Sequence, residues 1–121
     1  MLRLFLFVLF AALNIGLAYI DAHKIKQNKP INHGVNALLY LIPLIIVSLF
    51  IQSWTVPVGL LVIRIPVFNT SLNYFRGLSL DYLSVSTTSV IDRITNWLPR
   101  AIGYANYHVA LLIIAALLIA L

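Results

Sequence analysis

Apolar residues gather in four stretches along the 121 residues of the chain, at 4–20, 35–52, 54–68 and 101–121. A helix needs about 20 mostly apolar residues to cross a hydrocarbon core of about 30 Å. Short polar segments separate the stretches, and the last stretch ends in the continuous run ALLIIAALLIAL. The pattern predicts an all-α integral membrane bundle, a single domain over residues 1–121 with about four transmembrane helices.

The third stretch is the weakest of the four. It shares one apolar run with the second stretch, and a polar segment at 52–55 followed by Pro57 favours a helical hairpin there. Residues 54–68 span only about 22 Å as a helix, and they include Arg64. Two alternatives stay open: the helix extends to Phe75, or the segment is re-entrant.

The first stretch begins like a secretory signal, with Arg3 in front of an apolar run. No convincing small-x-small cleavage site follows before Asp21 ends the run. We therefore expect residues 4–20 to stay in the protein as a transmembrane helix.

Composition supports the membrane assignment. Hydrophobic residues make up 62% of the chain, charged residues only 9%, and the mean hydropathy is +1.01. A soluble domain carries about a quarter of its residues as charged side chains. The absence of cysteine excludes disulfide scaffolds, thiolate metal sites and cysteine nucleophiles.

Charge predicts the topology. Eight basic residues face three acidic ones, and seven of the eight bases fall in or beside the segments 21–34 and 69–100. Four spans place these segments on one side of the membrane, which the positive-inside rule identifies as cytoplasmic, with both termini outside. Three spans would place the two segments on opposite sides of the membrane, so the difference in basic charge between the two sides would mostly cancel. The bases are explained by anionic lipid headgroups, so we expect the bilayer as a partner and no nucleic acid.

A short interfacial amphipathic helix is predicted over residues 89–98. Ser89-Val-Ile-Asp92 has the spacing of a capping box, and Pro99 is expected to end the helix. Its apolar positions fall on one face. Trp97 and Arg100 are the expected interfacial anchors.

Three polar residues inside the predicted spans are the first candidates for function, because such groups are costly in lipid unless they are paired. They are Asn14, Arg64 and His108. Asn14 and His108 both lie about 11 Å from the cytoplasmic ends of their spans, so the two side chains could touch. The contact supports either a proton or ligand relay or, as we favour, an interhelical hydrogen bond that fixes packing.

Arg64 has two interpretations. It extends to the cytoplasmic face if its helix ends near Phe68, or it pairs with an acid if the helix continues. The sequence favours the first.

A metal site is an alternative that gives the chain an enzymatic role. Asp21, His23 and His33, completed by Asp81 or Asp92, offer the carboxylate and imidazole ligands of a zinc-like ion. The ten-residue gap between the histidines matches no standard ligand motif. We favour solvated loop residues and expect no cofactor.

The preferred function is non-catalytic: an accessory or assembly subunit that packs against other membrane proteins or copies of itself. Holin-like self-assembly is a variant, weakened because holins are expected to carry a charged C-terminal tail. The alternatives are a membrane-embedded metal-dependent hydrolase that uses Asp21, His23 and His33, and a small transporter or channel subunit with a wet cavity around Asn14, Arg64 and His108.

Overall fold

The computed structural model describes residues 1–83 and 96–121, and within these ranges all regular structure is helical. The helices are α1 (Leu2–Lys26), α2 (His33–Phe50), α3 (Thr55–Phe75), α5 (Trp97–Ile102) and α6 (Tyr104–Ala120). The predicted all-α class is confirmed for the described part of the chain.

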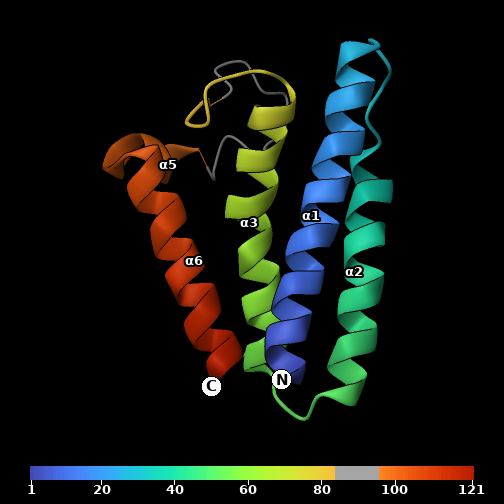
Figure 1. The fold of residues 1–121 in the computed structure, drawn as a ribbon, viewed down its shortest axis with the longest axis vertical. Helices are drawn as coiled ribbons and strands as arrows, with labels where there is room; N and C mark the ends of the chain where they lie inside the picture. The colour runs from blue at the N-terminus through green and yellow to red at the C-terminus, as the bar shows by residue number, and fades with distance from the viewer. Residues whose placement is uncertain (84–95) are drawn as a thin grey trace.

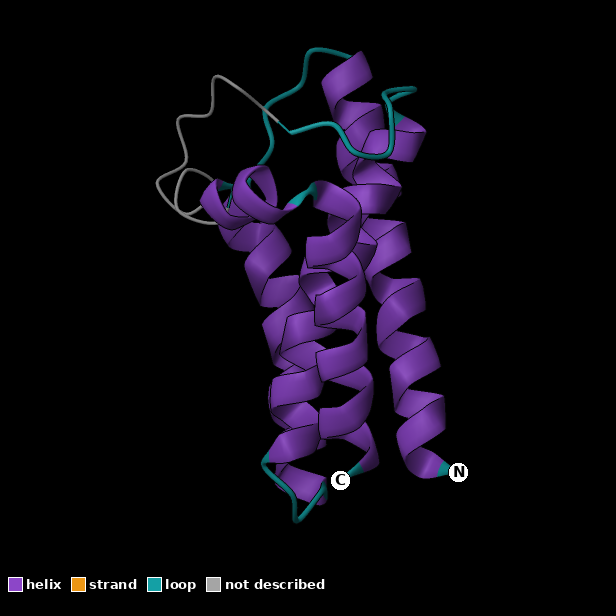
Figure 2. Cartoon of the chain, turned by 90° about the vertical axis from the view of Figure 1, so that its left-hand side faces the viewer, coloured by secondary structure: helices purple, strands orange, loops and turns teal. Residues whose placement is uncertain are grey.

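Four of the helices lie side by side, with α2 and α6 at the two edges and α3 between α1 and α6 (Figure 1). Both termini lie at the same end of the bundle. The α1–α2 loop and the segment after α3 lie at the other end, and α5 is displaced towards it (Figures 1 and 2). We call these the terminal end and the loop end.

Three helices, α1, α2 and α3, are long and apolar enough to cross a membrane. Helix α6 is also apolar, but its 17 residues are about 26 Å long, a little less than a typical hydrocarbon core. The structure thus supports a membrane protein with three candidate spanning helices, and α6 packs beside them.

The structure resolves the alternatives for the third stretch. Helix α3 continues without a break from Thr55 to Phe75 and includes the polar residues after Phe68. Its Pro57 lies in the first turn, where no intrahelical N–H bond is lost. At the start of α2, the side chain of Asn32 accepts a hydrogen bond from the Val35 amide at 3.1 Å, so this helix begins at His33.

The expectation that Pro99 ends a helix is wrong. Pro99 is the third residue of α5, which runs on to Ile102. The first four amides of a helix have no intrahelical acceptor, so a proline costs little there. Most of the predicted interfacial helix, residues 89–95, lies outside the described residues.

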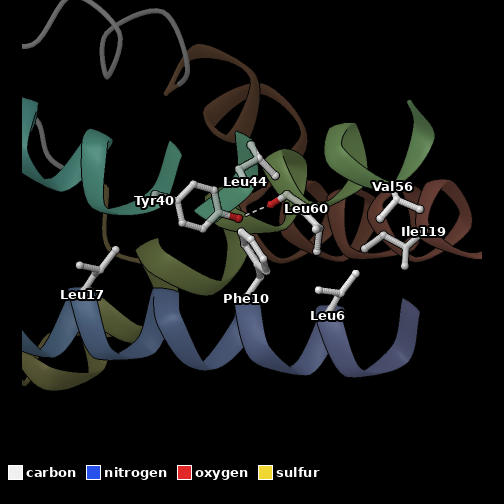
Figure 3. Packing of buried hydrophobic residues seen from close by; sticks show 8 residues of the cluster. All are labelled: Leu6, Phe10, Leu17, Tyr40, Leu44, Val56, Leu60 and Ile119. Carbon is white, nitrogen blue, oxygen red and sulfur yellow. Dashed lines mark hydrogen bonds between the residues drawn. The ribbon is translucent and has the colours of Figure 1, made fainter. Parts of the chain in front are cut away.

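The core joins residues from α1, α2, α3 and α6. Its buried side chains are Leu6, Phe10, Leu17, Tyr40, Leu44, Val56, Leu60 and Ile119 (Figure 3). Tyr40 reaches from α2 to the centre of this cluster, with its ring edge-on to Phe10 at a centroid distance of 5.5 Å.

Many large apolar side chains lie on the outer surface, and several polar side chains are buried. Leu49 and Phe50 are 79% and 82% exposed, whereas Asn14 is fully buried and Asp21 is 3% exposed. This is the reverse of the distribution in water-soluble proteins. It suits a protein whose outside faces lipid.

Candidate functional site

Polar side chains from three helices meet inside the bundle. The Asn14 carbonyl oxygen on α1 accepts a hydrogen bond from Arg64 Nη1 on α3 at 3.1 Å. The Asn14 amide donates to the Phe10 carbonyl at 2.8 Å and to the Tyr40 hydroxyl of α2 at 3.4 Å. Tyr40 in turn donates to the Leu60 carbonyl of α3. Asn14 therefore links α1 to both neighbouring helices.

Arg64 lies near the middle of α3, nine residues after Thr55 and eleven before Phe75. At a rise of about 1.5 Å per residue, it is roughly 14 Å from one helix end and 17 Å from the other. Its guanidinium carbon lies 4.8 Å from the centroid of the Tyr40 ring and 4.6 Å from that of Phe68. Both rings are within cation–π distance.

The favoured interpretation of Arg64 was wrong. The helix continues past Phe68, and the guanidinium bonds to Asn14 inside the bundle instead of extending to a membrane face. The alternative, in which Arg64 pairs with an acid, is only partly observed. Arg64 makes no direct ion pair within the described residues, but Asp21 lies within electrostatic range of it.

Asp21 forms a second buried contact on the loop-end side of Asn14. Both of its carboxylate oxygens accept from the Asn36 side-chain amide, at 2.7 and 2.6 Å. Asp21 follows Asn14 by two helical turns on α1, and Asn36 precedes Tyr40 by one turn on α2, so each pair shares a helix face. We call these five residues, Asn14, Asp21, Asn36, Tyr40 and Arg64, the polar seam.

The alternative metal site finds no support among the described residues. Within residues 1–83 and 96–121, no group of three or more His, Cys, Asp or Glu side chains could hold a metal ion. Helix α1 continues to Lys26, which turns Asp21 and His23 to different faces because residues two apart in a helix do not face each other. His23 stacks on Tyr19, and His33 is exposed at the start of α2.

Asp81 is exposed in the loop after α3, and Asp92 lies outside the described residues. Among the described residues, Asp81 belongs to no cluster that could hold a metal ion.

His108 is buried at the other edge of the bundle, away from Asn14. Its Nδ1 lies 2.9 Å from the Tyr104 carbonyl, and its ring stacks on the Tyr104 ring at a centroid distance of 3.7 Å. Its Nε2 has no hydrogen-bond partner within the described residues. Asn14 and His108, which their depths would have let touch, have different hydrogen-bond partners, because α3 lies between α1 and α6 (Figure 1).

The predicted interfacial anchors lie on α5. Trp97 is its first residue and Arg100 its fourth, and both are exposed. Figure 1 shows α5 displaced towards the loop end, next to the start of α6. Their contact with a membrane interface stays a prediction.

Asn36 and Tyr40 were missed in the sequence. The available signal was their spacing: with Leu44 they form an i, i+4, i+8 series, and these three are the buried residues of α2. Polar side chains on the single buried stripe of an apolar helix indicate contact with another helix.

A scan against protein-family models matches none of them, and searches of curated proteins and of solved structures return no significant match. The function of the chain is therefore inferred from the bundle itself.

Proposed function

We propose that this chain is a multi-pass membrane protein that acts as an accessory or assembly subunit of a membrane complex. In the proposed topology α1, α2, α3 and α6 each cross the bilayer, with the loop end in the cytoplasm. Support comes from Arg3, whose Nη1 donates to the Ala120 and Ile119 carbonyls at 2.9 and 3.3 Å. This contact holds the first turn of α1 against the last turn of α6, as an even number of crossings requires.

The outer surface of α2 is the observation that carries the proposal. Nine of its 18 residues are large hydrophobic side chains that are exposed, against five of 17 in α6, the other edge helix. Only the Asn36, Tyr40 and Leu44 side chains of α2 are buried. The exposed side chains of α2 are available to pack against helices of a partner protein or of a second copy.

The polar seam supports the same function. Its hydrogen bonds join α2 to α1 and α3, and a polar contact between helices specifies which faces meet more than it adds stability. The seam therefore fixes the rotation of α2, so that one defined apolar face is presented to the partner.

Photo-crosslinking from α2 tests the proposal. The chain has no cysteine, so Ile45→Cys can carry a single benzophenone label on the outer face of α2, and Ile113→Cys can carry the same label on α6. The two positions are matched, with exposed fractions of 58% and 55%. In native membranes we expect a discrete protein crosslink from position 45 and only lipid adducts from position 113.

The mass of the product identifies the partner. A species of twice 13.5 kDa indicates a second copy, and any other discrete mass indicates a different protein. Lipid adducts alone from both positions, together with a monodisperse monomer in mild detergent, would refute a subunit role.

A further inference from the structure

A groove of about 400 Å³ opens on the surface between α1 and α3, near the loop end. Its lining residues are Ile15, Thr70, Ser71, Tyr74, Phe75 and Leu80. The Thr70 hydroxyl is bonded to the Tyr104 hydroxyl at 3.1 Å, but the Ser71 hydroxyl makes no hydrogen bond within the described residues. The groove is therefore mainly apolar, and the Ser71 and Tyr74 hydroxyls are its polar groups without a hydrogen bond within the described residues.

Aromatic side chains place this groove at the level of a membrane–water interface. Tyr74, on the groove wall, is 68% exposed. Tyr19 stands one turn beyond Ile15 on α1 and packs edge-on against Phe75 at a centroid distance of 5.3 Å. Tyrosine is enriched at the headgroup level of bilayers, where its ring faces apolar groups and its hydroxyl faces water.

Two basic side chains lie at the aqueous end of the groove. Arg76 follows Phe75 directly; its guanidinium lies 5.9 Å from the Tyr82 ring centroid and makes no ion pair within the described residues. Lys26 is the exposed last residue of α1, eleven positions after Ile15, which puts both on the same helix face.

The exposed carboxylate of Asp81 directly follows Leu80 of the groove lining and offsets one of these charges. Lys24 and Lys29 also lie at the loop end. Among the described residues, the loop end thus keeps an excess of positive charge.

We propose that this groove binds one anionic phospholipid, with the headgroup phosphate between Lys26 and Arg76, the glycerol region near Tyr74 and Phe75, and an acyl chain that runs deeper past Ser71 and Ile15. The inference rests on the membrane embedding in the proposed function. Charge complementarity selects the lipid: each basic residue near the headgroup favours an anionic lipid about fivefold, whereas a zwitterionic lipid gains much less.

Native mass spectrometry of the full chain in detergent tests this site. Phosphatidylglycerol and phosphatidylcholine are added in equal amounts, and we expect one phosphatidylglycerol to bind preferentially. Arg76→Gln should lower its occupancy about fivefold, and Lys26→Gln with Arg76→Gln about 25-fold. Lys29→Gln removes the same charge from the exposed α1–α2 loop and should have little effect.

A steric variant locates the lipid. Ser71→Phe fills the groove without changing charge and should lower the binding of both lipids, while circular dichroism reports an unchanged helix content. Equal binding of the two lipids by the wild type overturns the proposal. So does an Arg76→Gln effect no larger than that of Lys29→Gln.

These outcomes are separate from those of the crosslinking experiment. A chain that binds phosphatidylglycerol as expected but gives no protein crosslink from α2 refutes only the subunit role. A chain that crosslinks to a protein but shows no lipid preference refutes only the lipid site.

Discussion

Asn14 shows how one side chain can organise three helices. Its oxygen accepts from Arg64 and its nitrogen donates to Phe10 and Tyr40, so its main hydrogen-bonding capacity is used without water. When one partner of a buried hydrogen bond is removed, the other partner stays unpaired in an apolar interior. The free-energy cost of that unpaired polar or charged group exceeds the stabilisation that the bond contributed. Asn14 therefore holds Arg64 and Tyr40 together in the polar seam, whereas Asp21 and Asn36 bond to each other separately.

Asn14→Leu should lower the free energy of unfolding by about 2 kcal/mol, since it leaves the Arg64 guanidinium without its hydrogen-bond acceptor. The measurement is an SDS unfolding titration in mixed micelles. In a double-mutant cycle, Arg64→Gln should be coupled to Asn14→Leu by about 1–2 kcal/mol.

The matched control is Asn106→Leu. Asn106 is exposed on α6 and donates only to the Ile102 carbonyl at 3.0 Å, so its loss should change stability by less than about 0.5 kcal/mol. Equal effects at positions 14 and 106 would show that the seam does not hold the helices.

At the scale of the elements, α3 and α6 approach closely because Gly59 has no side chain. A Cβ added there would lie 2.7 Å from Ile119 Cγ1 and 2.9 Å from the Ala115 carbonyl oxygen. Small residues allow this kind of close backbone approach between helices in membranes. The close contact complements the Thr70–Tyr104 hydrogen bond between the same two helices.

Gly59→Ala should destabilise the protein by about 1–3 kcal/mol, because the carbonyl of Ala115 cannot give way without moving α6. Gly16→Ala is the control on α1, where an added Cβ meets nothing within 4 Å. Alanine has the higher helix propensity, so this variant should be neutral or up to about 1 kcal/mol more stable. The same unfolding titration measures both variants. If both lowered the free energy of unfolding, the close packing of α3 on α6 at Gly59 would not explain the effect.

At the scale of the whole molecule, both termini share one end and the basic loops share the other (Figure 1). Lys24, Lys26, Lys29 and Arg76 belong to the loop end. Arg3, at the terminal end, bonds to the last carbonyls of α6. Helix C-termini carry partial negative charge, which accounts for a basic residue at that position.

Single-cysteine labelling tests the four-span topology. Gln27→Cys and Ser79→Cys lie at the loop end, and Gln52→Cys lies in the turn between α2 and α3. We expect the first two to react with a membrane-impermeant maleimide from the cytoplasmic side and the third from the opposite side. Labelling of positions 27 and 79 from opposite sides would reject four crossings.

Hydropathy identified the helices but not all of their ends. The polar residues after Phe68 belong to α3 because tertiary contacts use them: Asn73 donates to the Leu80 and Tyr82 carbonyls at 3.0 Å, and Thr70 bonds to Tyr104. The alternative of a metal site finds no support among the described residues for a related reason. It treated 21–33 as a loop, whereas α1 stays helical through Lys26 and turns Asp21 inward to Asn36.

By itself, the sequence determined that the chain forms long apolar helices and that its few internal polar groups need partners. Both conclusions follow from the free-energy cost of exposing backbone polar groups and charges to lipid. This cost depends on the residue and not on its tertiary neighbours. Only the tertiary structure decided the partners. Because α3 packs between α1 and α6, Asn14 bonds to Arg64 and His108 contacts Tyr104. Which residues become neighbours in a bundle depends on the rotation and order of whole helices.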